Sequence, residues 1–537
     1  MAQASTAQSY LIGVDVGTGS ARAGVFDAGG RMLASARREI TLWRAPGGIV
    51  EQSSDQIWEA VCASVREAVA AAEVPVAQVK GIGFDATCSL VVLGAEGRPL
   101  PVGPSEDPAR NIIVWMDHRA VAQAERINAL GHEVLRYVGG RISPEMETPK
   151  LLWLSEHRPE VFAEARDFFD LADFLTWKAT GSRARSTCTV TCKWTYLAHE
   201  GRWDPEYFRK VGLGVLADEG FARIGTQVVA PGTALAQGLG AEAAQALGLL
   251  PGTAVGAGMI DAHAGGIGTV GVEGAPTRTM AYVFGTSSCT MTSTAAPVFV
   301  PGVWGPYYSA MVPGLWLNEG GQSAAGAAID QLLSLHPATP EARALAQAAG
   351  KPFPVYLADR AVAAAGGPSE AIRLADRLHV VPEFLGNRAP LANPHARALI
   401  AGLGMESDLD NLVALYVAGL SGVAYGLRQI IEVQAQAGAP VGAIAISGGA
   451  GQLDLIRQLL ADATGTPVIA TAAEEPVLLG ASILGGVAAG LYPDMSAAMS
   501  AMTRAERRYA PQGGEIAALH DRRYAAFVKL QSLGAEL

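Results

Sequence analysis

A chain of 537 residues is too long for one hydrophobic core, because such cores stop growing near roughly 250–300 residues, so we expect two domains with a cleft between them. The 50% share of hydrophobic residues is enough to fill sizeable cores and excludes a disordered chain. The net charge of -11, with no basic run, argues against a nucleic-acid partner held by counterion release.

The first predicted strand ends in a carboxylate. In LIGVDVGTGSARAGVFD, residues 11–27, Asp15 follows an apolar run and precedes the turn Gly17-Thr18-Gly19-Ser20. Such a turn exposes backbone N–H groups that suit a phosphate oxygen, although an ordinary hairpin turn is the simpler alternative. A buried carboxylate is costly unless it is neutralised, so Asp15 is expected either near Mg2+ beside a phosphate or bonded to its own turn.

The rest of the first half alternates strands and helices. The β-rich runs 10–17, 30–40 and 79–94 surround a helical pattern at 53–72, which opens with the N-cap candidates Ser53 and Ser54. Residues 121–181 have a mostly helical pattern. This alternation predicts an α/β fold with crossover helices.

The second half begins like the first. Residues 14–26 and 281–293 both combine an apolar strand, a Gly-Thr-(Gly/Ser)-Ser turn and a second strand. The second turn contains Gly285, Thr286 and Ser287. Two such turns facing each other would clamp a polyphosphate, and their likeness suggests that the halves are versions of one fold.

The predicted domain boundary, near 255–272, carries a candidate base. In GAGMIDAHAGGIG, residues 256–268, Asp261 and His263 lie among apolar residues and glycines. Phosphoryl transfer to an alcohol needs a base near the hydroxyl, and we assign this role to Asp261, with a hinge or cap contact as the alternative. His263 is expected to pack beside the site. No GxxxxGK[ST] occurs, which excludes a P-loop, and the GxGxxG match at Gly266 lacks the strand and acid of a dinucleotide fold.

Several polar residues in apolar settings are candidate sugar contacts, because each sugar hydroxyl needs a donor and an acceptor while an aromatic ring covers its C–H face. Each alone is more often a structural hydrogen bond. They are Asp85, Thr87, Trp115, Asp117, Arg119, Lys193, Glu319 and Gln322.

Two apolar stretches, 412–427 and 477–491, are shorter than the roughly 20 residues that span a bilayer and are expected to be buried helices. The aromatic stretch 301–308 fits either a pocket wall or a subunit interface, as in a homodimer. MAQASTAQSY at the start lacks the features of a secretory signal. An odd number of scattered cysteines fits a reducing cytoplasm, where we expect the protein without membrane contact: Cys62, Cys88, Cys188, Cys192 and Cys289.

From about Tyr10 to about Tyr492 the sequence resembles the FGGY carbohydrate kinases, of the sugar kinase/Hsp70/actin fold superfamily. Its ribulokinase-type branch, especially the D-ribulokinases, is most similar, through strings such as GIGFDATCSLVVL, NIIVWMDHRA, WLNEGGQSAAG and PEFLGNRAPLA. The resemblance implies two actin-like (RNase H-like) α/β domains around an interdomain cleft. Residues 1–262 would bind sugar and carry the first phosphate loop, and residues 263–537 would carry the second and bind adenosine.

The resemblance also implies roles for single residues. Asp261 matches the catalytic base, Asp15 matches the acid near Mg2+, and Glu475 and Gly480 fall in the adenosine region. The expected ATP contacts are Gly17, Thr18, Gly19, Ser20, Arg22, Gly285, Thr286, Ser287, Gly448 and Gly449. The expected substrate contacts are Asp85, Thr87, Cys88, Trp115, Asp117, Lys193, Asp261 and Glu319.

The expected reaction is ATP-dependent phosphorylation of the terminal hydroxyl of a ketopentose, D-ribulose giving D-ribulose 5-phosphate. Stereoisomers differ by one hydroxyl orientation, so kinases for L-ribulose, xylulose or a pentitol are alternatives. An ATP-binding switch without catalysis, as among the actin relatives, is the alternative from another class.

Overall fold

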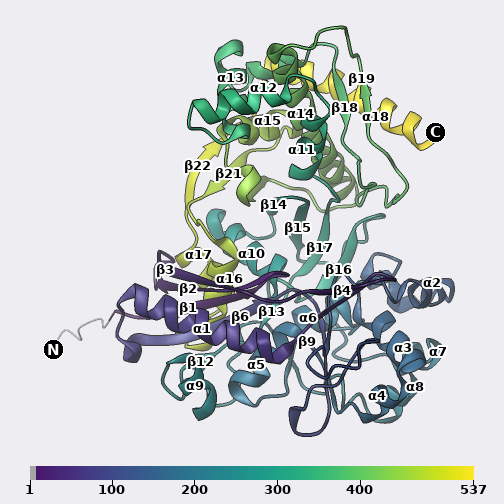
Figure 1. The fold of residues 1–537 in the computed structure, drawn as a ribbon, viewed down its shortest axis with the longest axis vertical. Coiled ribbons are helices and arrows are strands. Elements are labelled where there is room, and N and C mark those ends of the chain that lie inside the picture. Colours follow the sequence, from purple (N-terminus) through teal and green to yellow (C-terminus); the bar gives the residue numbers. More distant parts are fainter. Residues whose placement is uncertain (1–7, 537) are drawn as a thin grey trace.

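The computed structural model describes residues 8–536, which form two α/β lobes, one above the other in Figure 1. The lower sheet has the order β12-β6-β1-β2-β3, with β13 also paired to β6. Its strands are β1 (Tyr10–Val16), β2 (Ser20–Asp27), β3 (Met32–Glu39), β6 (Val79–Ala86), β12 (Ala254–Val255) and β13 (Met259–Ile260).

The upper sheet has the order β16-β17-β15-β14-β20-β21-β22. Its strands are β14 (Thr279–Phe284), β15 (Ser288–Thr294), β16 (Trp304–Tyr308), β17 (Trp316–Gln322), β20 (Ala443–Ser447), β21 (Val468–Thr471) and β22 (Ala505–Tyr509).

The two sheets share one topology. In the lower sheet β1 pairs antiparallel with β2 and parallel with β6. In the upper sheet β14 pairs in the same way, antiparallel with β15 and parallel with β20. The predicted likeness of the halves is therefore confirmed at the level of strand order.

A third sheet extends the lower lobe, with the order β4-β5-β8-β7-β9. It consists of β4 (Trp43–Ala45), β5 (Ile49–Gln52), β7 (Leu90–Leu93), β8 (Ile112–Ile113) and β9 (Asp167–Asp170). The prediction that residues 121–181 are mostly helical is confirmed, with the exception of Asp167–Asp170, a buried strand paired with β7. The remaining strands form two small two-stranded sheets. In one, β10 (Arg185–Ser186) pairs with β11 (Val228–Val229), and in the other β18 (His379–Val381) pairs with β19 (Leu399–Ala401).

The helix predicted at 53–72 is confirmed as α1 (Ser54–Ala72), where the Ser53 hydroxyl accepts the backbone N–H of Gln56 at 3.3 Å. The other helices of the lower lobe are α2 (Val121–Ala129), α3 (Glu147–His157), α4 (Pro159–Glu164), α5 (Leu171–Thr180), α6 (Thr187–Lys193), α7 (Pro205–Lys210), α8 (Gly214–Asp218) and α9 (Ala241–Leu247). The helices that follow are α10 (Asp261–Val270), α11 (Gly326–Ser334), α12 (Thr339–Ala348), α13 (Phe353–Ala365), α14 (Leu409–Gln436), α15 (Asp454–Thr464), α16 (Pro476–Ala488), α17 (Met495–Met502) and α18 (Gly514–Glu536).

Helix α14 is long and apolar enough to cross a membrane by length and composition, but 72% of its apolar window is buried inside the protein. It forms much of the core of the upper lobe, together with buried side chains from α11, α13 and α15. The expectation of a buried helix at 412–427 is confirmed.

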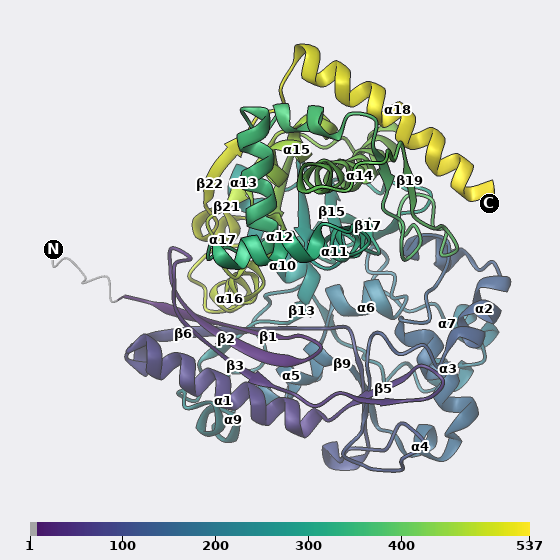
Figure 2. The same cartoon turned by 45° about the horizontal axis from the view of Figure 1, so that its top comes forward.

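Helix α16 comes late in the sequence yet packs on the lower sheet, against β1, β6 and α10 (Figures 1 and 2). Glycines permit this contact: a Cβ on Gly13 would lie 1.9 Å from the carbonyl oxygen of Leu478, and one on Gly480 would lie 1.9 Å from that of Ala264. The lower lobe thus includes a segment from the second half of the chain. A division between residues 262 and 263 would also cut α10 after its second residue.

Candidate active site

Three carboxylates meet at one edge of the lower sheet. Asp15 on β1 pairs in register with Asp85 on β6, and β13 pairs with the end of β6 so that Asp261 follows directly. All three strands run parallel, and the carboxyl edge of such a sheet is where ligands bind. The sequence prediction placed these residues in one site, and the topology brings them together.

Burial and neighbouring carboxylates raise the pKa values of Asp85 and Asp261. Both oxygens of Asp85 are buried without a hydrogen-bond partner, and burial together with Asp15 raises its pKa well above the usual range. Burial and Asp15 likewise raise the pKa of Asp261 to about 6. Asp261 is half-buried, and its Oδ1 accepts the N–H of Ala262 at 2.7 Å.

A Mg2+ ion fits this edge through Asp15 and the unpartnered oxygens of Asp85. Mg2+ is usually held by one or two carboxylates, by water and by substrate phosphates, so a cage of protein ligands is not required. No three Asp, Glu, His or Cys side chains within residues 8–536 converge on a metal position.

The first predicted phosphate loop is a tight turn between β1 and β2, closed by a bond from Gly17 N–H to the Ser20 carbonyl at 3.0 Å. Trp115 Nε1 donates to the Thr18 hydroxyl at 3.0 Å, which gives this expected sugar residue a contact with the loop. Gly19 is exposed, and a Cβ there would meet no atom within 4 Å. Space for a phosphate group is therefore open beside the turn.

The second turn repeats this arrangement between β14 and β15. Gly285 N–H bonds to the Ser287 carbonyl at 2.9 Å, and the carbonyls of Gly285 and Thr286 accept N–H groups at the start of α11. Thr286 is exposed. Both turns thus present backbone and hydroxyl groups at the end of a β-hairpin.

Arg22 connects the two halves. Its Nε donates to Asp15 Oδ2 at 2.7 Å, and another guanidinium nitrogen donates to Glu475 Oε2 at 2.8 Å. The same side chain lines a pocket of about 690 Å³ together with Gly448, Gly449 and Glu475. The expected ATP contacts from three distant parts of the sequence therefore border one space.

A second, more apolar pocket of about 340 Å³ adjoins the first and shares Gly449 and Gln452 with it. Ile329, Leu420 and Leu453 supply apolar walls, and Asp330 is the one carboxylate among its lining residues. A Cβ on Gly449 would meet no atom within 4 Å. Its size and character suit a planar aromatic base.

Trp304 lies opposite Glu319 on the neighbouring strands β16 and β17. Lys193 Nζ lies 5.8 Å from the centre of the Trp304 ring, and the Arg388 guanidinium carbon lies 5.7 Å from it. Lys193 and Glu319 were predicted sugar contacts, whereas Arg388 was missed and Trp304 was noted only within the aromatic stretch 301–308.

The charges of this cluster support one another. Burial would raise the pKa of Glu319, but a hydrogen bond from His263 and the charge of Lys193 lower it to about 2. Burial would lower the pKa of Lys193, but Cys88 and Glu319 raise it well above the usual value. Glu319 is therefore an ionised acceptor and Lys193 a charged donor at neutral pH.

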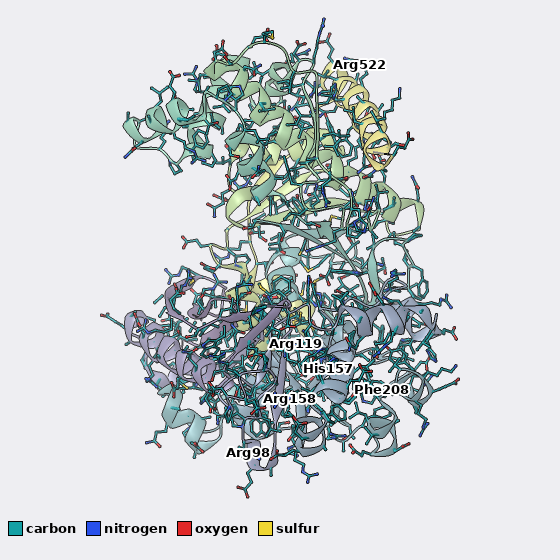
Figure 3. All side chains as sticks on the ribbon, turned by 45° about the vertical axis from the view of Figure 1, so that its right-hand side comes forward. Arg98, Arg119, His157, Arg158, Phe208 and Arg522 are labelled. Atoms are coloured by element: carbon teal, nitrogen blue, oxygen red, sulfur yellow. The ribbon has the colours of Figure 1, made fainter. Side chains whose placement is uncertain are left out.

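Asp117, one of the predicted substrate contacts, is bonded within the lower lobe. It is fully buried, and its oxygens accept bonds from the backbone N–H groups of Val50 and Arg119 and from the Arg119 guanidinium. Arg119 also pairs with Glu51 at 3.0 Å, within the lower lobe (Figure 3). These contacts use both carboxylate oxygens of Asp117 within the lower lobe, and its assignment as a sugar contact stays a prediction.

Thr87 and Cys88 are also buried. The Thr87 hydroxyl lies 3.3 Å from that of Ser89, and burial raises the pKa of the Cys88 thiol to about 12, so this thiol is neutral. Gln322 supports the second turn, since its Oε1 accepts from the Ser288 hydroxyl at 3.1 Å.

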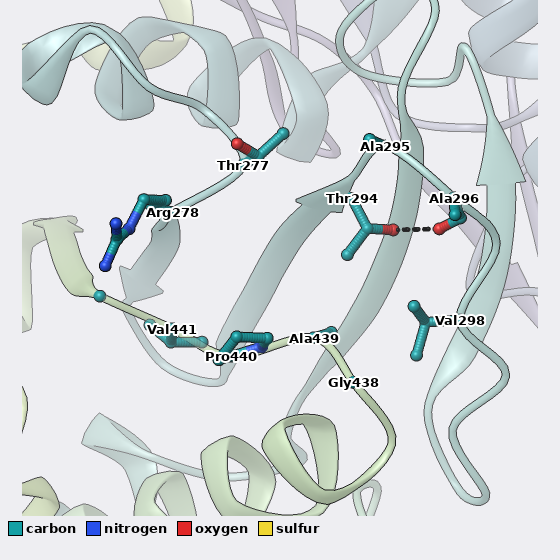
Figure 4. Close-up of a pocket in the computed structure, with 11 residues that line it drawn as sticks. Thr277, Arg278, Thr294, Ala295, Ala296, Val298, Gly438, Ala439, Pro440 and Val441 are labelled. Carbon is teal, nitrogen blue, oxygen red and sulfur yellow. Dashed lines mark hydrogen bonds between the residues drawn. The ribbon is translucent and has the colours of Figure 1, made fainter.

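A separate pocket of about 370 Å³ lies near Thr277 and Arg278 (Figure 4). These residues precede β14, whereas the Gly285 turn follows it. A strand of six residues is about 20 Å long, so this pocket lies at the opposite edge of the sheet.

The FGGY family of carbohydrate kinases matches most of the chain, its N-terminal domain over residues 10–268 and its C-terminal domain over residues 280–489. A human FGGY carbohydrate kinase domain-containing protein is 44% identical, with 97% of this chain and 96% of that protein covered. A D-ribulokinase of Saccharomyces cerevisiae is 39% identical, with 89% and 72% covered. Among solved structures, a xylulose kinase from Rhodospirillum rubrum has a TM-score of 0.80 at 23% identity, covering 98% of each chain.

Proposed function

Because the chain belongs to the FGGY family of carbohydrate kinases, we propose that it phosphorylates the terminal hydroxyl of D-ribulose with ATP, giving D-ribulose 5-phosphate and ADP. The 39% identity to the yeast D-ribulokinase supports this substrate. Bacterial ribulokinases, such as that of Mycolicibacterium smegmatis at 30% identity over 98% of this chain, support a ketopentose.

Asp261 is the proposed base. The observation behind this proposal is that Asp261 lies at the same edge of the sheet as Asp15 and the first turn. The substrate oxygen attacks the γ-phosphorus as its proton passes to an Asp261 oxygen. The new O–P bond forms while the bond to the β-phosphate oxygen breaks, releasing ADP. A pKa of about 6 leaves Asp261 ionised yet basic at neutral pH.

The two turns are proposed to hold the phosphates of ATP. Backbone N–H groups and the hydroxyls of Thr18, Ser20, Thr286 and Ser287 are the donors available there. A bound Mg2+ would neutralise phosphate charge, with Asp15 and Asp85 as the residues that hold it. The apolar pocket beside Gly449 is the proposed place of adenine, with Gln452 and Asp330 within it as polar partners.

Lys193, Glu319 and Trp304 are proposed to hold the sugar, with Trp304 covering its C–H face. Arg388, whose guanidinium carbon lies 5.7 Å from the centre of the same ring, adds a donor that the sequence analysis did not name. The sugar would then lie between the Asp261 edge of the lower sheet and β17 of the upper one.

The domain limits 1–262 and 263–537 are retained as a working division, with α16 assigned to the lower lobe. We further propose a cytoplasmic enzyme whose ligands are a small sugar and ATP. All five cysteines lie within the described residues as free thiols, which supports a reducing compartment.

The test is ADP release by the purified protein with ATP and Mg2+, in the presence of D-ribulose, L-ribulose, D-xylulose, L-xylulose, ribitol or no sugar. Turnover confined to D-ribulose supports the proposal. Turnover with another sugar identifies that sugar as the substrate in place of D-ribulose and leaves the proposed mechanism unchanged. Equal ADP release with and without sugar contradicts the kinase proposal and favours a nucleotide switch.

A further inference from the structure

A buried histidine joins three elements of the candidate site. His263 on α10 is 1% exposed, and its Nδ1 lies 3.1 Å from Cys188 Sγ on α6. Its Nε2 lies 3.3 Å from Glu319 Oε2 on β17. Cys188 is fully buried and Glu319 is 7% exposed, so water does not compete for these contacts.

Each ring nitrogen has one polar neighbour. Ionised Glu319 can only accept, so Nε2 carries a proton. Cys188 Sγ already accepts the backbone N–H of Ile260 at 3.3 Å. Two arrangements satisfy this geometry: a thiol that donates its S–H to a bare Nδ1, or a thiolate that accepts Nδ1–H. In the second arrangement the ring carries a proton on each nitrogen.

The electrostatics agree with this geometry. Burial would lower the pKa of His263, but Cys188 and then Glu319 raise it above the usual value. Burial would raise the pKa of Cys188, but a hydrogen bond from Cys192 and the charge of His263 lower it. The other charged groups that act on Glu319 are Lys193 and Arg388, both cationic.

We propose that His263 is a positioning residue: as an imidazolium between the Cys188 thiolate and Glu319, it holds Glu319 ionised and oriented toward the sugar. This inference rests on the proposed function. It assigns no reaction step to His263 and no redox chemistry to Cys188. It gives the histidine a charge and a partner on each side, where the sequence predicted only a packed residue.

The arrangement also couples two sugar contacts. Helix α6 carries Cys188 near its start and Lys193 at its end, so the histidine ties the helix that bears Lys193 to the strand that bears Glu319. These two residues belong to different lobes. A change of charge at His263 would therefore alter the sugar site without contact with the nucleotide pockets.

The first test is His263→Gln in the full-length protein, with His520→Gln as the matched control. His520 is 1% exposed and bonds to the Tyr425 hydroxyl at 3.0 Å on the distant helix α18. Glutamine still donates one N–H to Glu319 but carries no charge. We expect the KM for the sugar to rise at least about tenfold, with the KM for ATP changed less than about twofold.

The pH profile separates this role from packing. Without the imidazolium the pKa of Glu319 rises, so the KM for the sugar should increase more steeply as the pH falls in His263→Gln than in the wild type or in His520→Gln. The acid limb of kcat is read separately, because it belongs to Asp261, whose pKa His263 also lowers. A sugar KM that is unchanged at every pH in a folded His263→Gln protein overturns the proposal.

The second test reads the charges directly and does not depend on turnover. The ultraviolet absorbance of a thiolate at neutral pH should be present in the wild type and absent in Cys188→Ser, and nitrogen NMR should show both His263 ring nitrogens protonated. A neutral thiol or a singly protonated ring overturns the proposal even if His263→Gln fails to fold. If no sugar is phosphorylated but both signals are seen, the proposed function is wrong, whereas the charges assigned to Cys188 and His263 are supported.

Discussion

Asp261 sets the pH dependence expected of turnover. Its pKa is raised to about 6, and a base must be ionised to accept a proton, so activity is retained above this pH and lost as the pH falls through it. We expect kcat to fall about tenfold for each pH unit below 6. Initial rates with saturating sugar and ATP across this range measure the limb, and a flat profile would remove Asp261 from the role of base.

Asp261→Asn should lower kcat by about 10²–10⁴-fold, because the amide cannot take the proton of the attacking hydroxyl. The affinity for ATP, measured by calorimetry, should change little, since the turns and pockets proposed to hold the nucleotide are untouched. The pH limb should disappear with the carboxylate. A variant with substantial turnover and the original limb would contradict the assignment.

The raised pKa of Asp85 predicts how the free energy of unfolding changes with pH. Its pKa in the folded state is raised above the unfolded value, so the folded state binds the extra proton, and stability falls as pH rises from about 4. Asp85→Asn removes the buried carboxylate and should raise the free energy of unfolding by about 1–3 kcal/mol at pH 8, and by less at pH 5. Thermal unfolding at both pH values measures this, with the exposed Asp359→Asn as control.

The residues that sequence could predict lie in short local patterns. Asp15 with its glycine turn and Asp261 with its glycines each stand out within a dozen residues. Arg388 does not, because it lies in an irregular loop and meets Trp304 only through the tertiary fold. The bonds of Asp117 were not predicted for the same reason, since its partner Val50 is 67 residues away in the sequence.

At the scale of elements, the contact between α16 and α10 depends on Gly480. A Cβ there would lie 1.9 Å from the Ala264 carbonyl oxygen, which is backbone and cannot move alone. Gly480→Ala should therefore destabilise the protein by about 1–3 kcal/mol or more, measured by urea unfolding. Gly367→Ala is the matched control, because its Cβ would meet no atom within 4 Å. Equal stability of the two variants would contradict the packing described.

Periodicity found the long elements and missed a short one. The apolar patterns of 53–72 and 412–427 correctly predicted α1 and part of α14, because each pattern follows one helix face over several turns. Strand β9 has only four residues, DFFD, and its identity depends on pairing with β7 far away in the sequence. No local pattern distinguishes such a segment from a helical turn.

At the scale of the molecule, the proposed site draws residues from both lobes. Asp261 and the first turn lie on the lower sheet, whereas Glu319 and the second turn lie on the upper one. We expect a smaller radius of gyration in X-ray scattering with D-ribulose and ADP·Mg2+ together than with either alone. Closure excludes water, so ATP hydrolysis without sugar should be slow. Scattering that is identical in all states would contradict closure.

Helix α16 has a consequence for how the chain is made. On the ribosome β1 and β6 emerge early, but the helix that covers them comes near the end of the sequence. The first lobe therefore waits with an uncovered apolar face while most of the second lobe is synthesised, a state in which nascent chains are prone to aggregate. We expect the product to become protease-resistant only after residue 488 has left the exit tunnel, and truncated chains ending before Pro476 to depend on chaperones.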